Sequence, residues 1–235
     1  MKTLDNARSM QERFSLPNRL PYKNITMAVR ERLMMELLFS NKYEPGEWIN
    51  ESVIVNELNI SKAPIREALR ELAAIGLVQI VPHKGARVTE FTKRDMEEIY
   101  TIRYMLEECI FKDIIVRDAV TEDDINHLNG IAQKMKMIAM SDKPKELILG
   151  NFLEKDLEFH KYLWLKADLK WTIKMLLDIY LLLILGIYKF LLDANLTETA
   201  EYHFRIIDYI KAKDIEKFKK DRSESYYALR RCTSD

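Results

Sequence analysis

The segment that most constrains the fold covers residues 59–88 and reads NISKAPIREALRELAAIGLVQIVPHKGARV. It begins with a helical pattern in which Ile65, Leu69 and Leu72 recur on one face, a spacing typical of a helix packed against a core. A glycine follows at a point where helices often end. Two short apolar runs then flank a turn that contains Gly85. The segment therefore predicts a helix followed by a β-hairpin.

Two further helices are predicted ahead of this segment. From residue 23 to about residue 39, apolar residues recur at helical spacing. A second, short helix is expected over residues 51–58, because Asn50 suits the N-cap and Asn59 suits the left-handed residue that ends a helix. Three helices followed by a hairpin form the outline of a winged helix-turn-helix, in which the second helix of the motif enters the major groove of DNA.

After about Phe91 the sequence shows helical patterns only, with no strand pattern and no internal repeat. Thr92 and Thr121 are expected to open the first two of about six helices, which predicts an antiparallel bundle. The chain of 235 residues is long enough for two domains. We therefore predict a mainly α protein with three parts: an N-terminal arm (1–22), a winged helix-turn-helix domain (23–91) and a helical domain for effector binding and dimerisation (92–235).

Composition limits the classes of function. The formal net charge is zero, so any surface that attracts nucleic acid has to be local. Cys109 and Cys232 lie far apart and form no CxxC pattern, which indicates neither a disulfide framework nor a zinc ribbon. The longest apolar run, residues 179–188, is about half of a bilayer span. We expect a cytoplasmic protein with no membrane segment.

Two cations stand at the start of the third helix. Lys62 and Arg66 are four residues apart, so they share one face, away from the apolar stripe. The Arg66 fork suits bidentate pairing with guanine, whereas Lys62 is a point charge for a base or a phosphate. Ser61, the expected N-cap, and the helix-terminal N–H groups suit a phosphate. In the predicted wing, contacts with the DNA backbone or minor groove are expected from His83, Lys84 and Arg87. The simpler alternative for such cations is a solvated helix face.

This segment resembles the signature of the GntR family of bacterial transcription factors, whose usual form is S-R-T-P-V-R-E-A-L, then G-L-V and a G-x-x-V wing. The chain matches it in SKAPIREAL, GLV and GARV, and the earlier PGEWINE is similar to the family's P-G-x-x-L-x-E. The resemblance covers residues 25–90 and implies that Ser61, Lys62, Ala63, Arg66 and the wing residues His83, Lys84, Gly85 and Arg87 bind DNA. Lys62 and Ala63 depart from the usual Arg and Thr.

A second group of polar residues lies in the helical part. Asp156 and His160 are four residues apart and stack on one helix face, a spacing that lets two side chains share a metal. His203 lies on another predicted helix with apolar neighbours, so a bundle can bring it opposite the first pair. The alternatives are a helix-stabilising Asp–His pair and a hydrogen-bonded core histidine. His127 is expected at the surface.

The order D-x-x-F/L-H followed by E-x-H resembles the FCD domain of FadR-type regulators, and this points to the FadR subfamily. In metal-binding members an Asp and three His hold a divalent cation beneath a pocket for a small carboxylate. The resemblance implies Zn, Ni or Mn on Asp156, His160 and His203. The fourth His position falls at Ser225, so the alternatives are three ligands with water or a contribution from Asp221.

The stretch IRYMLE resembles the opening helix of the same domain, V-R-x-x-L-E. Arg103 lies on an apolar stripe, which favours an inward guanidinium that holds a carboxylate. Its alternative is an exposed pair with Glu107. We therefore place Arg103 and Ser225 at the effector-binding site. The apolar segment 171–192 is most simply a buried central helix, and a greasier ligand such as an acyl chain is the alternative.

These inferences predict a ligand-responsive transcription factor that binds a palindromic double-stranded DNA operator as a homodimer. Its effector is expected to be a small carboxylate, with or without metal. A metalloenzyme that uses Asp156, His160 and His203 is the rival class, but the sequence shows no positioned nucleophile or general base, so we expect no enzyme activity. A metal-free binding module with structural histidines is the third alternative.

Overall fold

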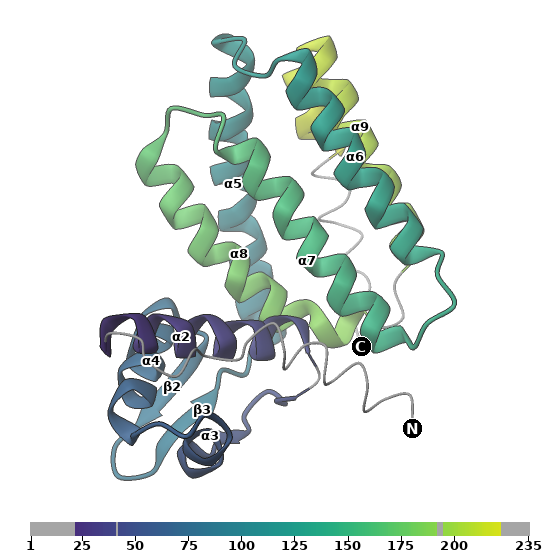
Figure 1. Ribbon diagram of the computed structural model, residues 1–235. Helices are drawn as coiled ribbons and strands as arrows, with labels where there is room; N and C mark the ends of the chain where they lie inside the picture. Colours follow the sequence, from purple (N-terminus) through teal and green to yellow (C-terminus); the bar gives the residue numbers. More distant parts are fainter. Residues whose placement is uncertain (1–21, 41, 192–194, 222–235) are drawn as a thin grey trace. The chain divides into compact units, whose positions relative to one another are not determined.

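The computed structural model describes residues 22–40, 42–191 and 195–221. The chain divides into two compact units between Glu90 and Phe91. The first unit contains helices and a small antiparallel sheet, and the described part of the second contains helices (Figure 1). This confirms the predicted mainly α fold class.

In its described residues, the first unit has three helices and three short strands. The helices are α2 (Tyr22–Phe39), α3 (Glu51–Leu58) and α4 (Lys62–Ile75). The strands are β1 (Trp48–Ile49), β2 (Val78–Val81) and β3 (Gly85–Val88), in the spatial order β1-β3-β2. The hairpin of β2 and β3 was predicted. Strand β1 was not, because two residues are too short to show an alternating pattern.

The ends of α3 and α4 follow from local chemistry. Asn50 Oδ1 accepts hydrogen bonds from the backbone N–H groups of Ser52 and Val53, and so caps α3. Asn59 and Gly76 end the two helices in left-handed conformations. Ser61 occupies the N-cap position of α4, but its side chain makes no capping hydrogen bond. The prediction that Ser61 caps the helix is therefore correct for the position and wrong for the side chain.

The core of the first unit lies between α2 and α4. These helices pack together, and each contributes fully buried apolar side chains, among them Val29 and Leu33 from α2 and Ile65 and Leu72 from α4. Burying one face of α4 in this way leaves its opposite face, with Lys62 and Arg66, exposed.

The hairpin turn has a defined geometry. The Lys84 N–H donates to the Val81 carbonyl at 3.1 Å, and His83 has a φ of 61°. Pro82 precedes it, so the turn is of type II, which prefers proline first and a positive φ second. Gly85 also has a positive φ, 107°, where a side chain would be strained. The turn places the side chains of His83 and Lys84 in solvent.

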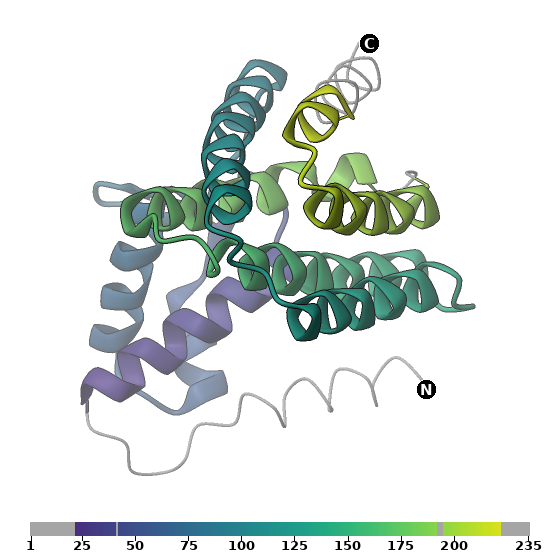
Figure 2. The ribbon, with the colours of Figure 1, turned by 90° about the horizontal axis from the view of Figure 1, so that it is seen from above.

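The second unit is built from α5 (Lys93–Val116), α6 (Glu122–Ala139), α7 (Lys145–Trp164), α8 (Lys170–Leu191) and α9 (Leu196–Ala212). Residues 215–221 are also helical. Capping boxes begin α5 and α6, at Thr92 with Asp95 and at Thr121 with Asp124. Helix α5 packs against α8, and α6 packs against both α7 and α9 (Figure 2).

Helix α8 packs part of its apolar surface against α5. Leu183 and Ile187 form a buried cluster with Met96, Ile99 and Tyr100 of α5. A Cβ atom at Gly186 would lie 2.1 Å from Met96 Sδ, so glycine permits the close approach of the two helices. This packing accounts for part of the apolar run in the segment, in which Trp171 and Met175 are exposed. No helix in the described ranges combines the length and the apolar character needed to span a bilayer.

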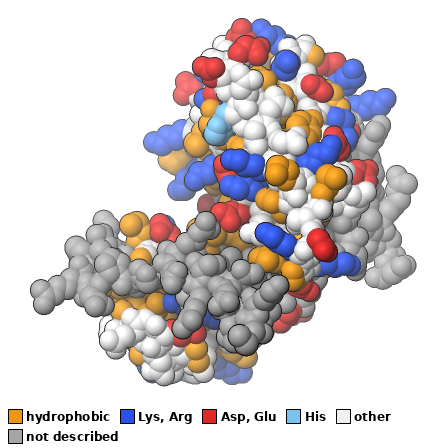
Figure 3. All heavy atoms as spheres, turned by 45° about the vertical axis from the view of Figure 1, so that its right-hand side comes forward, with side chains coloured by type: hydrophobic (Ala, Val, Ile, Leu, Met, Phe, Trp, Pro, Cys, Tyr) orange, Lys and Arg blue, Asp and Glu red, His pale blue; other side chains and the backbone are white. Residues whose placement is uncertain are grey.

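The visible surface carries charges of both signs. On the face shown in Figure 3, Lys and Arg side chains are intermixed with Asp and Glu. This agrees with a net charge of zero. Functional charge must therefore be sought in particular clusters.

Candidate functional site

The N-terminal end of α4 is exposed. Ser61, Lys62, Ala63 and Arg66 all lie at the surface, and the side chain of Arg66 is 57% exposed. Lys62 and Arg66 stand one helical turn apart, so they present two cations along one line. The structure thus brings these predicted residues together on one accessible face.

Arg66 is held by an acidic neighbour that the sequence reasoning missed. Its Nε lies 3.0 Å from Oε2 of Glu51, the first residue of α3. The Glu51 side chain is only 19% exposed, so it is fixed between the two helices. The contact uses Nε, so it leaves the two terminal amino groups of the guanidinium for other partners. Glu51 is part of the PGEWINE stretch, which was the only signal for it in the sequence.

The predicted wing residues are also accessible. His83, Lys84 and Arg87 are exposed, and Gly85 is partly exposed between them. Arg87 on β3 is paired in register with Gln79 on β2, and its Nε and Nη2 bond to Gln79 Oε1 at 3.0 and 2.8 Å. The side chain of Arg87 is thus anchored across the hairpin, whereas Lys84 at the turn has no such anchor among the described residues.

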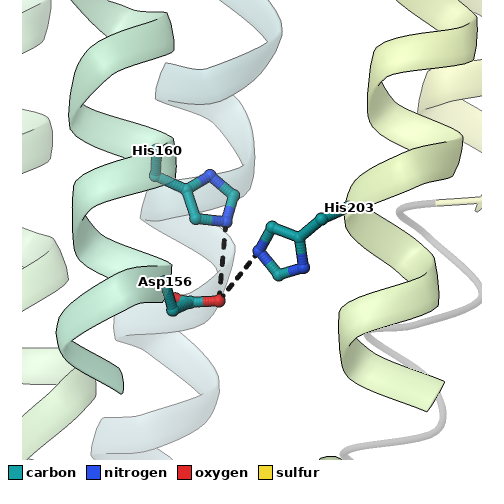
Figure 4. A group of neighbouring side chains, drawn as sticks. All are labelled: Asp156, His160 and His203. Atoms are coloured by element: carbon teal, nitrogen blue, oxygen red, sulfur yellow. Dashed lines mark ion pairs between the residues drawn. The ribbon is translucent and has the colours of Figure 1, made fainter. Parts of the chain in front are cut away.

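The second unit brings Asp156, His160 and His203 together (Figure 4). Asp156 and His160 lie on α7, and His203 faces them from α9. One ligand atom from each residue lies within 4.8 Å of the others. His160 and His203 are 3% and 1% exposed, and Asp156 is 9% exposed. The predicted convergence of the three residues is therefore present, deep in the helical unit.

The tautomer of His203 follows from its partner. Its Nδ1 lies 2.8 Å from the Thr199 carbonyl oxygen, which only accepts hydrogen bonds, so Nδ1 carries a proton. The other nitrogen, Nε2, lies 2.9 Å from Asp156 Oδ1 without the geometry of a hydrogen bond. A neutral imidazole would place a lone pair against a carboxylate there. A cation bound to both atoms would relieve this repulsion.

The partner of His160 fixes its tautomer too. Its Nε2 lies 3.2 Å from Nη2 of Arg103, and a guanidinium only donates, so Nε2 accepts. Its Nδ1 is 3.4 Å from Glu107 Oε1. The acceptor nitrogen Nε2 also lies 3.9 Å from Asp156 Oδ1. Both histidines therefore direct Nε2 toward the same carboxylate oxygen.

These atoms suit a divalent cation. One carboxylate oxygen and two imidazole nitrogens are ligands that zinc and related metals accept. A hydrogen bond from the second ring nitrogen to a carbonyl, as at His203, is the usual way of orienting a metal-binding imidazole. Asp156, His160 and His203 would hold the ion, and the fit rests on the donor set and on the tautomers.

Arg103 is buried, and it is paired with Glu107. Its Nε and Nη2 each lie 3.2 Å from Glu107 Oε1, and the two residues are 6% and 1% exposed. The guanidinium also stacks over the Tyr180 ring, 4.4 Å from its centroid. The alternative of an exposed Arg103–Glu107 pair is therefore wrong. The inward orientation is correct, and Glu107, expected only as a surface partner, belongs to the buried cluster.

Two residues with buried hydrogen-bond donors, Trp164 and Tyr180, lie beside His160. The rings of Trp164 and Tyr180 lie 5.6 and 5.4 Å from the His160 ring, and both residues are nearly inaccessible. Within the described part of the chain, Trp164 Nε1 and the Tyr180 hydroxyl find no hydrogen-bond partner. Such orphaned groups are uncommon in protein interiors and call for an explanation.

Three other predicted residues are placed as follows. Asp221 is engaged elsewhere, since its Oδ2 accepts from Arg205 Nε at 3.0 Å and from the Tyr209 hydroxyl at 2.8 Å. Ser225 lies outside the described residues. His127 is exposed, as expected, with its ring against Tyr162.

Comparisons with known proteins divide the chain in a similar way. The family model described as "Bacterial regulatory proteins, gntR family" matches residues 23–88, and the model of the FCD domain matches residues 98–220. The second match alone spans more than half of the chain.

Individual relatives match either most of this chain or less than half of it. The gluconate operon transcriptional repressor of Bacillus subtilis is 26% identical over 75% of this chain and 72% of its own length. The regulator McbR of Escherichia coli is 23% identical over 84% of this chain and 87% of its own. The uncharacterised regulator YdhC of Bacillus subtilis is 34% identical, but over only 40% of this chain and 42% of its own.

Solved structures show the same fold. The structure of Escherichia coli McbR superposes with a TM-score of 0.74 at 21% identity, over 89% of this chain and 96% of that one. A GntR regulator from Rhodococcus sp. RHA1 superposes with a TM-score of 0.68 at 16% identity, over 88% and 96% of the two chains. At these identities the likeness supports the fold alone.

Proposed function

This chain belongs to the gntR family of bacterial regulatory proteins and carries an FCD domain, and we propose that it binds a palindromic operator as a homodimer under the control of a small carboxylate. The finer placement in the FadR subfamily, and action in the bacterial cytoplasm, are parts of the same proposal. The relatives are transcription regulators, which favours this class over a metalloenzyme.

The exposed N-terminal end of α4 supports the DNA-binding part of the proposal. A recognition helix that enters the major groove uses its first turns to reach base edges. Arg66 offers a guanidinium whose orientation is fixed by Glu51, and Lys62 lies one turn earlier. His83, Lys84 and Arg87 would contact the backbone beside it. Ser61 and Ala63 stand where the helix begins and allow close approach to a phosphate.

Changing Glu51 to Gln tests whether the carboxylate aims Arg66. We expect affinity for a specific operator to fall severalfold, because the guanidinium loses its charged anchor, while affinity for random DNA stays equal or rises, because an anion is removed. Fluorescence anisotropy with both duplexes measures the two affinities. The matched control is Glu67→Gln, which removes the same charge from the α4 surface but not from Arg66. A rise in both affinities would contradict an aiming role.

The convergence of Asp156, His160 and His203 on one point carries the effector part of the proposal. A divalent ion held there would supply a Lewis acid that binds one oxygen of a carboxylate. Arg103 would pair with a second oxygen, and Glu107 would keep the guanidinium in place. Elemental analysis of protein purified without chelator tests this, with His203→Ala as the variant that loses the ion. Absence of metal in the native protein, with no uptake of added zinc, nickel or manganese, would favour a metal-free sensor.

The two orphaned donors indicate the kind of acid. Trp164 and Tyr180 offer an N–H and an O–H beside His160, so the site is rich in donors and favours a ligand with several oxygen acceptors. One relative is a repressor of a gluconate operon, and gluconate is a polyhydroxylated acid. We therefore favour a hydroxylated small carboxylate over a long acyl chain, since Leu183 and Ile187 of α8 are already packed against α5.

Replacing Tyr180 by Phe separates a ligand role from a structural one. An orphaned buried hydroxyl costs about 1–3 kcal/mol, so its removal should raise the unfolding free energy of the ligand-free protein by about 1 kcal/mol. The same change should weaken binding of a hydroxylated acid such as gluconate severalfold and leave hexanoate, of equal carbon number, unaffected. Thermal melts and calorimetric titrations measure these effects. A less stable Tyr180→Phe protein would contradict the assignment.

Control of DNA binding requires that the effector bind two states with different affinity. We propose that effector binding between α5, α7, α8 and α9 changes the spacing or mobility of the two DNA-binding units in the dimer. An operator shift assay with and without the acid tests this link.

A further inference from the structure

We propose that Arg103 and a divalent cation compete for the same atom, Nε2 of His160. The inference rests on the proposed function, in which Asp156, His160 and His203 hold a metal. It adds that the metal site contains its own competitor, and that Arg103 limits the affinity of the site for metal.

The geometry allows only one occupant of that nitrogen at a time. An imidazole nitrogen that carries no proton has a single lone pair in the ring plane. Arg103 Nη2 uses it at 3.2 Å. A zinc ion would need the same lone pair at about 2.0–2.1 Å. Metal uptake must therefore break the Arg103–His160 hydrogen bond, and the metal affinity is reduced by the free energy of that bond.

The displaced guanidinium stays close to the site. Glu107 Oε1 lies 3.2 Å from both Nε and Nη2 of Arg103, and the Tyr180 ring lies beneath the guanidinium. These contacts do not involve His160, so they persist when the metal binds. The Nη2 group then has a free N–H donor next to the ion. An anionic oxygen can bind the ion and accept from this donor. Metal uptake thus prepares the site for a carboxylate, and the two ligands should bind with positive cooperativity.

A competing role and a purely structural role for Arg103 predict opposite changes in the affinity for metal. If Arg103 only supports the fold around Glu107, its alteration disorders the site and weakens metal binding. If Arg103 is a competitor, its alteration strengthens metal binding and weakens carboxylate binding. The best variant is Arg103→Lys, which keeps the positive charge and the pairing with Glu107 but has a shorter side chain without the fork.

The test measures the dissociation constants of zinc and manganese by competition with a chromophoric chelator, on the full chain. In Arg103→Lys the metal no longer has to break the hydrogen bond between the charged guanidinium and His160. We therefore expect the dissociation constant for metal to fall about tenfold. Arg103→Met serves as a second variant. In the double variant Arg103→Lys/His160→Gln the shared nitrogen is gone, so the gain should disappear. Thermal melts report whether each variant is folded.

The outcomes separate this inference from the proposed function. Metal binding by the wild type with equal or weaker binding by folded Arg103→Lys overturns the competition and leaves the metal-assisted function standing. Metal binding by Arg103→Lys alone supports the competition and removes the metal from the function of the native protein. Failure of every variant to bind metal overturns both. A zinc-loaded crystal structure in which Arg103 Nη2 still bonds to His160 Nε2 would also overturn the competition.

Discussion

Arg66→Ala is expected to lower affinity for a specific operator at least tenfold for each half-site. One bidentate pair between arginine and guanine contributes about 1–3 kcal/mol of discrimination, and Arg66 is exposed at the N-terminal end of α4. Affinity for random DNA should fall much less, because one cation is a small part of the phosphate attraction. The specific duplex is obtained by selecting from random sequences with the wild-type protein, and gel shift or anisotropy gives both constants.

A matched control for this prediction lies on the same helix. Arg70 lies one turn after Arg66, and its side chain is 68% exposed. It pairs with Glu67. Arg70→Ala removes the same charge farther from the helix N-terminus, so the ratio of specific to random affinity should hardly change. Equal losses in Arg66→Ala and Arg70→Ala would mean that α4 contributes charge and does not read bases.

The largest effect on stability is expected from Glu107→Ala. Removing one partner of a buried ion pair leaves an uncompensated charge, which typically costs about 3–5 kcal/mol. Glu107 is 1% exposed, and Arg103 and His160 both contact it. For a protein of this size the midpoint of thermal unfolding should fall by about 10 °C. Circular dichroism melts of the ligand-free protein measure the change.

The neighbouring residue provides the control. Glu108 pairs with Lys219 at 2.9 Å, but its side chain is 36% exposed, so Glu108→Ala should cost less than about 1 kcal/mol. Replacing both members of the buried pair, in Arg103→Met/Glu107→Leu, should recover most of the loss, because no lone charge remains. A Glu107→Ala protein as stable as Glu108→Ala would show that the buried pair is not formed.

The helical framework was predictable because its signals are local. Capping boxes at Thr92 and Thr121, the left-handed Asn59 and the proline and glycine of the wing each act within a few residues. The side chain of Ser61 does not cap α4, although the helix begins where expected. Strand β1 escaped prediction because it exists only through its pairing with β3.

The candidate sites were predictable in part. Residues four apart on one helix, such as Asp156 and His160, meet by helical geometry alone. The contact of His203 with Asp156, by contrast, depends on how α9 lies against the rest of the unit. The pairing of Arg103 with Glu107 follows from the i, i+4 spacing, although its burial does not. The contacts of Glu51 with Arg66 and of Arg103 with His160 join separate helices. No periodicity in the sequence encodes such contacts.

Each unit serves one part of the proposed function, DNA binding in the first and effector sensing in the second. The first presents cations at the start of one helix on a small scaffold whose core lies behind them. The second buries an arginine, two carboxylates and two histidines, an arrangement that is costly unless the groups satisfy one another or a ligand. The first arrangement suits a surface that meets DNA, and the second suits a sensor.

The most direct test of the account pairs a protein change with a single-atom change in the DNA. In the selected duplex, 7-deazaguanine replaces guanine at one position of each half-site in turn, which removes the N7 acceptor that a bidentate arginine needs. At one such position, the wild type should lose about tenfold in affinity, while Arg66→Ala should lose nothing further. Independent, additive losses at every position would contradict the claim that Arg66 reads a base from the start of α4.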